Sequence, residues 1–148
     1  MLSRRARYAL KALINLARQP NGASQVRLLA EEEHIPRRFL EVIMVDLRKA
    51  GLVESSRGKA GGYRLTRPAG LISFADVIRI LDGPLALVPC VSRNFYARCE
   101  DCDDEATCEL RQVMAVVRNQ MSDVLDRTTL ADAVAGTAPS YFGEVVPG

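Results

Sequence analysis

The sequence predicts a mainly α-helical protein with a small β-hairpin wing, that is, a winged helix-turn-helix followed by a long C-terminal dimerisation helix. Three observations lead to this prediction. Two short helical segments are joined by a tight break, a basic and glycine-rich hairpin follows them, and an apolar stripe runs through residues 108–125. Helix, break, helix and hairpin in this order are typical of a head that binds double-stranded DNA.

The first two helices of this head are expected over residues 5–17 and 26–33. Apolar side chains recur every three or four residues in both segments, as on the buried face of a helix. A Pro-Asn-Gly turn ends the first segment, and Ser24 is placed to cap the second. The side chains expected to face inward from the second helix are Leu28, Leu29 and Ala30.

A third helix is expected from Pro36 to Ala50, after a break at His34 and Ile35. Proline fits the first turn because its missing N–H would have no partner there, and Gly51 suits the position after the last turn. Its apolar side chains form a face expected to be buried: Phe39, Leu40, Ile43, Met44 and Leu47. Its charged side chains are the candidate DNA contacts, with a solvated charged face as the alternative: Arg37, Arg38, Glu41, Arg48 and Lys49.

The hairpin is expected to have strands at residues 52–56 and 63–65, joined by a basic tip that contains three glycines. Glycine permits tight turns and a close approach of the backbone to a sugar-phosphate surface. An arginine on a wing suits a narrow minor groove or its phosphates, although a glycine-rich hairpin alone is a common turn. The candidate DNA contacts of the wing are Arg57, Gly58, Lys59, Gly61, Gly62 and Tyr63.

The remaining chain is expected to hold a helix capped by Ser73, a loop over residues 85–107, a helix over 108–125 and a short helix over 128–135. The apolar stripe of residues 108–125 is wide, and little chain is left to cover it, so the same helix of a second subunit is its expected partner. These elements predict four parts: a DNA-binding domain (1–83), a cysteine-containing sensor loop (84–107), a dimerisation region (108–136) and a flexible tail (137–148).

Charge divides the chain into two halves. Residues 1–80 contain 15 lysines and arginines against seven acidic residues, whereas residues 81–148 contain five against 11. A basic half joined to an acidic half indicates that one half meets a polyanion, and uneven surface charge is the alternative. The apolar run near the start is broken by Lys11, Asn15 and Arg18, which argues against a signal peptide or a membrane span and predicts a cytoplasmic protein.

All four cysteines lie close together, separated by eight, two and five residues: Cys90, Cys99, Cys102 and Cys108. In a cytosolic chain such a cluster indicates metal or redox chemistry, since thiolates suit iron–sulfur clusters and zinc. Neighbouring acidic residues make free thiolates harder to form. Four readings stay open: a cluster, zinc on four thiolates, metal-free thiol sensing, and a structural loop.

An enzyme is not expected. The single histidine, His34, lies far from the cysteines, which gives little support to a Ser-His-Asp or Cys-His catalytic set. The Cys99-x-x-Cys102 pair also occurs in thiol oxidoreductases, but there it opens a helix of an α/β fold, and no βαβ pattern exists here.

Four motifs closely resemble the IscR/NsrR/RirA group of Rrf-type regulators, over about Leu2 to Ala135. They are Arg-Tyr-Ala-Leu at residue 7, Ile-Pro-Arg-Arg-Phe-Leu-Glu at 35, Leu-Arg-Lys-Ala-Gly-Leu-Val at 47 and Arg-Gly-Lys-Ala-Gly-Gly-Tyr at 57. The resemblance implies a homodimer with an N-terminal winged helix and a long helix crossing between subunits. It also implies binding to near-palindromic operator DNA, usually to repress transcription and sometimes to activate it.

The resemblance also implies an iron–sulfur cluster held by three cysteines, the last two about five residues apart. Cys102 and Cys108 fit this interval, Cys90 fits the first ligand, and Cys99 is either a fourth ligand or a spare thiol. The choice between [2Fe–2S] and [4Fe–4S] stays open.

The chain departs from the pattern at Arg111, where some relatives place a histidine, and at Arg7, where a nitric-oxide-sensing branch has aspartate. Two more departures are Val42 and Val45, outward positions of the third helix where relatives often carry polar residues.

Overall fold

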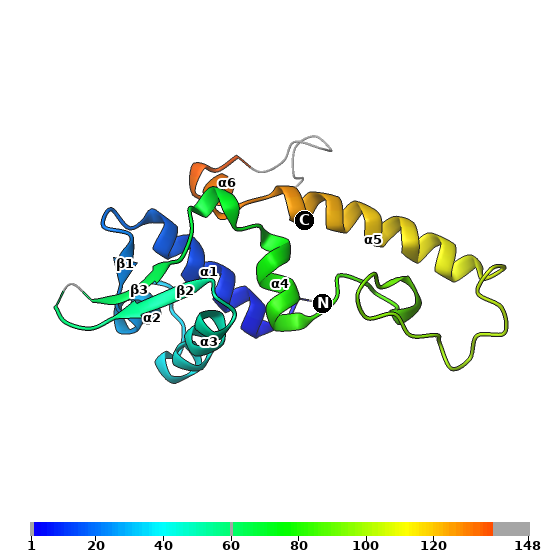
Figure 1. The fold of residues 1–148 in the computed structure, drawn as a ribbon, viewed down its shortest axis with the longest axis horizontal. Coiled ribbons are helices and arrows are strands. Elements are labelled where there is room, and N and C mark those ends of the chain that lie inside the picture. The colour runs from blue at the N-terminus through cyan, green and yellow to red at the C-terminus, as the bar shows by residue number, and fades with distance from the viewer. Residues whose placement is uncertain (1, 60, 138–148) are drawn as a thin grey trace.

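The computed structural model describes residues 2–59 and 61–137, and within them the predicted fold class is confirmed. Most of the tail expected over residues 137–148 lies outside the described residues. The helices are α1 (Arg4–Arg18), α2 (Val26–Glu32), α3 (Arg37–Lys49), α4 (Phe74–Asp82), α5 (Glu109–Arg127) and α6 (Leu130–Ala135). The strands are β1 (Ala23–Ser24), β2 (Val53–Ser56) and β3 (Gly62–Leu65), and short 3-10 turns cover Ala69–Leu71 and Pro89–Val91. Figure 1 shows a head that contains the sheet and α1–α4, from which α5 projects.

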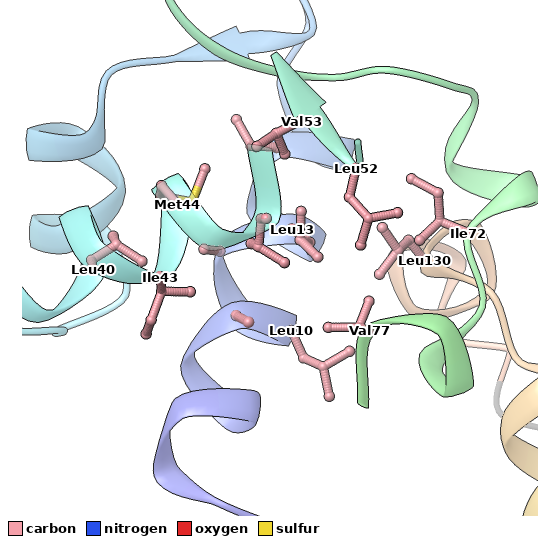
Figure 2. Close-up of a cluster of buried hydrophobic side chains, with 14 of the residues drawn as sticks. Leu10, Leu13, Leu40, Ile43, Met44, Leu52, Val53, Ile72, Val77 and Leu130 are labelled. Carbon is pink, nitrogen blue, oxygen red and sulfur yellow. The ribbon is translucent and has the colours of Figure 1, made fainter. Parts of the chain in front are cut away.

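Helix α1 is the centre of the head, because α2, α3, α4, α6 and strand β3 all pack against it. Its Leu13 and Leu16 are fully buried, and Ser3 caps its first turn by accepting a hydrogen bond from the N–H of Ala6. Figure 2 shows the cluster in which Leu10 and Leu13 of α1 meet Leu40, Ile43 and Met44 of α3 and Leu130 of α6. Apolar side chains at helical spacing thus form one core that fixes the orientation of α3.

The wing is a three-stranded antiparallel sheet in the order β1-β3-β2, in which Tyr63 lies opposite both Ser24 and Ser55. Strand β1 was not expected from the sequence. The prediction that Ser24 caps α2 is wrong, because Gln25 occupies the N-cap position without a side-chain hydrogen bond and Ser24 belongs to the sheet. Ser24 therefore pairs with β3, distant in the sequence, instead of capping the neighbouring helix.

Two side chains expected to be buried are largely exposed. Phe39 is 44% exposed and Leu28 is 38% exposed. The buried face of α3 consists of Leu40, Ile43, Met44 and Leu47, which leaves Phe39 at the margin of that face. There its ring meets the ring of Tyr8 edge-on, with the centroids 5.7 Å apart. Half of an aromatic side chain thus remains on the surface next to α3.

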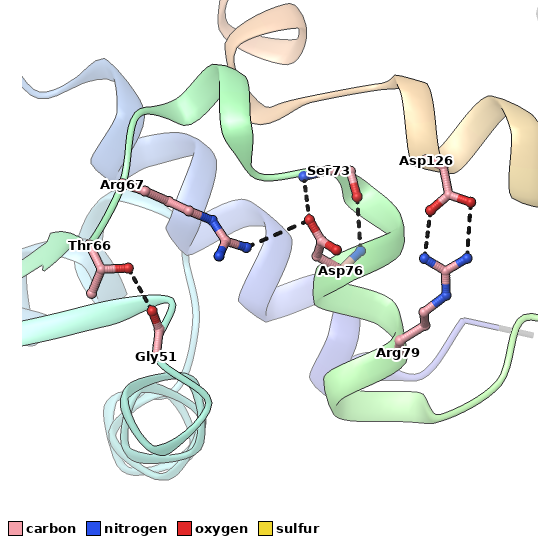
Figure 3. Close-up of polar contacts among 7 residues, drawn as sticks. All are labelled: Gly51, Thr66, Arg67, Ser73, Asp76, Arg79 and Asp126. Atoms are coloured by element: carbon pink, nitrogen blue, oxygen red, sulfur yellow. Dashed lines mark hydrogen bonds and ion pairs between the residues drawn. The ribbon is translucent and has the colours of Figure 1, made fainter. Parts of the chain in front are cut away.

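The C-terminal end of α5 is attached to the head at several points. Arg79 of α4 donates two hydrogen bonds to the carboxylate of Asp126, at 2.5 and 3.0 Å, as Figure 3 shows. Beyond α5, the N–H of Phe74 donates to the carbonyl of Thr128 at 2.9 Å, and the N–H of Leu130 donates to the carbonyl of Ile72 at 3.0 Å. Helix α6 then packs on α1, so the chain returns to the head.

The opposite end of α5 lies far from the head, next to the loop that carries the cysteines (Figure 1). With 19 residues, α5 spans about 28 Å. Among the described helices, none combines the length and the apolar character that crossing a membrane requires.

Candidate DNA-binding face and cysteine pocket

The head positions α3 as the second helix of a helix-turn-helix. The break after α2 passes through His34, whose φ of 54° is in the left-handed region, and through Ile35, which is buried at 4% exposure. A buried side chain directly after an unusual backbone angle fixes how α3 leaves the turn. Since α3 packs on α1 through one face only, its opposite face is left on the surface of the head.

Three of the charged residues predicted on α3 make polar contacts within the head. The Nε of Arg37 lies 2.9 Å from a carboxylate oxygen of Glu41, one helical turn later. Arg48 donates to the hydroxyl of Ser55 at 3.4 Å, which places the end of α3 beside β2. Arg38 and Lys49 are exposed. The structure thus brings the predicted helix and wing residues onto neighbouring elements of one head.

The base of the wing is tied to the end of α3. The hydroxyl of Thr66, just after β3, donates to the carbonyl of Gly51 at 2.6 Å (Figure 3). The N–H of Thr66 also donates to the carbonyl of Leu52 at 3.1 Å. These bonds fix the direction in which the hairpin leaves the head.

The glycines at the wing tip have different structural roles. Gly58 has φ of +101° and open space around its Cα, whereas Arg57 and Lys59 beside it are exposed. At Gly61, an added Cβ would lie 2.5 Å from the carbonyl oxygen of Ser56. At Gly62, which has φ of +131°, it would lie 2.5 Å from the carbonyl oxygen of Ser24. Gly61 and Gly62 are therefore required by the hairpin and by the approach of β1.

Tyr63 and Arg5 both help to hold elements of the head together. Tyr63, a candidate DNA contact, is half-buried and packs partly against the core of the head. Arg5 was not identified from the sequence, yet its guanidinium forms an ion pair with Asp46 of α3 and holds α1 against that helix. No sequence signal marks this pair, because its members lie 41 residues apart and on different helices.

All four predicted cysteines line one cavity of about 250 Å³, which we call the cysteine pocket. The pocket lies between the loop after α4 and the first turn of α5. Cys90 is buried at 6% exposure, and the other three cysteines are half-buried. Its remaining lining residues are Val88, Asp101, Asp103, Asp104, Thr107, Leu110 and Arg111.

Three of these thiols have neighbours that affect their position or their ionisation. Cys108 is the N-cap residue of α5, and its Sγ accepts a hydrogen bond from the N–H of Arg111 at 3.4 Å. The thiol of Cys99 lies near that of Cys90, and this proximity raises the pKa of Cys99 above its ordinary value. Burial and the negative charge of Asp101 act in the same direction. Cys99 therefore ionises less readily than an ordinary thiol.

The donor set of the cysteine pocket fits a thiolate-ligated group in its chemistry. Four thiols converge on one space, and they come from both sides of a loop whose end is the start of α5. The described residues contain no group of three His, Cys, Asp or Glu side chains already arranged to hold a single metal ion. The sulfur atoms would thus have to move to become ligands together.

This fold and this exposed face define a winged helix-turn-helix DNA-binding protein. Residues 2–136 match the family model of Rrf2, described as an iron-dependent transcriptional regulator. The chain belongs to the Rrf2 family of transcriptional regulators. The resemblance seen in the sequence motifs is thereby confirmed, as is the expectation that the protein is a regulator rather than an enzyme.

Relatives and solved structures agree with this assignment. An Rrf2-like regulator of Rhodobacter capsulatus is 42% identical over 95% of this chain and 96% of its own length. A helix-turn-helix regulator of Mycobacterium tuberculosis is 37% identical over 97% of this chain and 87% of its own length. The structure of CymR, the global cysteine regulator of B. subtilis, matches with a TM-score of 0.76 at 33% identity, over 93% of this chain and 98% of that one. IscR of T. potens matches with a TM-score of 0.72 at 28% identity, over 97% and 93%.

Proposed function

We propose that this protein is a homodimeric repressor that binds a near-palindromic operator and senses iron–sulfur, redox or sulfur status through the cysteine pocket. The observation that carries the sensing role is the convergence of all four cysteines on one cavity at the start of α5. In this proposal one chain carries both the DNA-binding head and the sensor.

The DNA contacts are assigned to α3 and the wing. Arg38 and Lys49 are exposed on α3, and Arg57 and Lys59 are exposed at the wing tip. A helix of this kind enters the major groove, while a basic wing reaches the adjacent backbone or minor groove. Gly61 and Gly62 support this contact by allowing the hairpin to close, and Gly58 shapes the tip itself.

The homodimer is assigned to α5. Leu110, Val113 and Val116 are 60%, 57% and 61% exposed, so an apolar surface covers the part of α5 that projects from the head. Towards its C-terminal end, Met121 and Leu125 pack against the core. An uncovered apolar surface on a long helix is the feature that a second copy of the same helix would bury.

An iron–sulfur cluster is the group proposed for the cysteine pocket, with Cys90, Cys102 and Cys108 as ligands and Cys99 as a fourth ligand or a spare thiol. When bound, such a cluster supplies a redox-sensitive tie between the loop and the start of α5. Cys108 is the residue through which this tie reaches α5, because it forms the N-cap of that helix.

A metal-free thiol sensor is the second candidate, and the presence of Cys90 and Cys99 in the same cavity favours it. Hydrogen peroxide would take two electrons and two protons from the two thiols, forming one S–S bond and releasing two molecules of water, whereas an organic hydroperoxide would release one water and one alcohol. A solved structure of the oxidised form of Staphylococcus aureus CymR matches this chain with a TM-score of 0.70.

Anaerobic purification separates these candidates. The iron–sulfur proposal expects visible absorbance, with iron and sulfide in the protein, and loss of both in Cys108→Ser. A colourless protein that contains zinc would show that the thiolates hold zinc rather than a cluster. A colourless, metal-free protein whose operator affinity falls after peroxide treatment, but not in Cys99→Ser, would favour the thiol pair. A metal-free protein that binds DNA identically before and after oxidation would contradict both forms of sensing.

A further inference from the structure

The outward face of α3 carries an apolar centre between basic ends, and the inference drawn from it rests on the DNA-binding function proposed above. Arg38, Val42, Val45 and Lys49 follow one another at intervals of four, three and four residues, which places them on one face of the helix. We call these four residues the α3 stripe. The stripe lies opposite the buried Leu40 and Leu47 and therefore points away from the core.

The centre of the α3 stripe is accessible apolar surface. Val42 is 62% exposed, and Val45 is half-buried. A hollow of about 290 Å³ opens beside Val42, where it is lined by Arg5, Arg38, Phe39, Val42 and Ile43. Together with the exposed part of the Phe39 ring, Val42 forms a continuous apolar area on a helix whose other exposed residues are mostly charged.

The charges around this apolar area suit a polyanion. Arg38 and Lys49 mark the two ends of the α3 stripe. The acidic residues that flank the stripe are both ion paired, Glu41 with Arg37 and Asp46 with Arg5. The face therefore presents cations at its ends and little uncompensated negative charge beside its apolar centre, as contact with the two phosphate rims of a major groove requires.

Valine restricts what the centre of the stripe can recognise. Its side chain has no hydrogen-bond donor or acceptor, so it cannot distinguish the nitrogen and oxygen atoms of base edges. The apolar group that the major groove offers is the C5-methyl of thymine. We propose that Val42, assisted by Val45, is a specificity-determining residue that selects operators by contact with thymine methyl groups.

The test begins with the full-length protein and a library of random duplex DNA, from which bound sequences are selected. Each thymine of the selected sequence is then replaced singly by deoxyuridine, which pairs identically and lacks only the C5-methyl. At one or two positions in each half-site, the dissociation constant is expected to rise about three- to fivefold for each methyl removed.

Val42→Ala provides the second arm of a double-mutant cycle. For the thymine that Val42 contacts, the deoxyuridine replacement is expected to have no further effect in Val42→Ala, whereas Val42→Ile keeps the full effect. Leu71→Ala is the matched control, because Leu71 is 67% exposed but lies outside α3, and the methyl effect should persist in it. Unchanged thermal unfolding of the variants checks that the head stays folded.

The possible results distinguish the role of Val42 from DNA binding itself. Selected sequences without thymine in the half-sites, or a methyl effect of equal size in the native protein and in Val42→Ala, would overturn the role of Val42 while leaving DNA binding intact. Failure to enrich any sequence, at low as well as at moderate salt, would overturn sequence-specific DNA binding and the methyl contact with it.

Discussion

At the scale of single residues, the three glycines of the wing look alike in the sequence but differ in what surrounds them. A methyl group on Gly61 or Gly62 would meet backbone atoms at 2.5 Å, and backbone cannot rotate away as a flexible side chain can. A methyl group on Gly58 would meet nothing within 4 Å and would only strain a positive φ. The sequence therefore marks the glycines, and only the fold separates their roles.

Gly62→Ala is expected to destabilise the protein by more than about 2 kcal/mol, since it combines a backbone collision with a strained φ. Gly58→Ala should lower the free energy of unfolding by about 1 kcal/mol only. Urea unfolding followed by circular dichroism measures both values. Equal effects for the two variants would contradict the distinction between the hairpin closure and the tip.

Arg57→Ala is expected to weaken operator binding by about 1–3 kcal/mol, because its exposed guanidinium is placed at the wing tip to meet a groove or phosphate. The slope of log affinity against log salt should also become less steep. Fluorescence anisotropy at several salt concentrations measures both quantities. Arg18→Ala, a change to an exposed arginine at the end of α1, is the control, and an Arg57→Ala titration that overlays the native one would rule out the contact.

At the scale of elements, helices were predictable where their signals are local. The expected limits of α1 and α3 and the expected start of α4 agree with the structure within one or two residues, because apolar periodicity, Ser73 as a cap and Gly51 after α3 all act through near neighbours. Strand β1 was missed because two residues carry no period, and their partner Arg64-Tyr63 lies about 40 residues further along the chain. The exposure of Phe39 likewise depends on the position of α1, which helical spacing alone does not specify.

In the candidate site, too, local patterns were predictable from the sequence and long-range contacts were not. The cysteine spacing pointed to a shared site, and the structure does bring all four cysteines to one cavity. The proximity of Cys99 to Cys90 was not predictable, since eight intervening residues form a loop without periodicity. Similarly, the charges of α3 were visible in the sequence, but the pairing of Asp46 with Arg5 required two helices to meet.

The link between α4 and α5 has a predicted pH dependence. The hydrogen bonds from Arg79 hold the pKa of Asp126 below its ordinary value, so the charged carboxylate is favoured by folding. This contribution is fully present above about pH 4, the range in which an unfolded aspartate is ionised, and it is lost as the pH falls through the lowered pKa. Both side chains are at least one third exposed, so solvent screening keeps the contribution below about 1 kcal/mol.

Asp126→Asn should therefore reduce the melting temperature slightly at pH 7, and the difference from the native protein should shrink as the pH falls below 4. Differential scanning calorimetry across this range measures the change. Glu54→Gln is the matched control, because Glu54 is an exposed carboxylate of β2. A constant difference at all pH values would show that the carboxylate charge is not what joins the two helices.

At the scale of the whole molecule, α5 has a covered and an uncovered end. Near the head its side chains pack into the core, whereas Leu110, Val113 and Val116 remain exposed at the far end beside the cysteine pocket. If a second copy covers these side chains, its position also determines the distance between the two α3 helices. Half-site spacing on DNA would then depend on the same helix that carries Cys108 as its N-cap.

Val113→Asp is expected to convert the proposed dimer to a monomer at micromolar concentration, because a charge in the centre of an apolar interface has no partner. Operator affinity should fall by at least about tenfold, as one head alone makes half of the contacts. Sedimentation velocity and operator titration on the same samples check both effects. Asp123→Asn, an exposed change on the same helix, should leave the dimer intact, and a native-like dimer of Val113→Asp would exclude α5 as the interface.

The return of α6 to α1 has a consequence for what happens when the polypeptide is cut. The segment around Arg98 is exposed and separates the head from α5, yet beyond α5 the chain is bound to the head again by backbone hydrogen bonds and by the fully buried Leu130. Trypsin nicking at Arg98 should accordingly give two fragments on a denaturing gel that still elute as one native particle, and the C-terminal fragment would remain docked without a covalent connection.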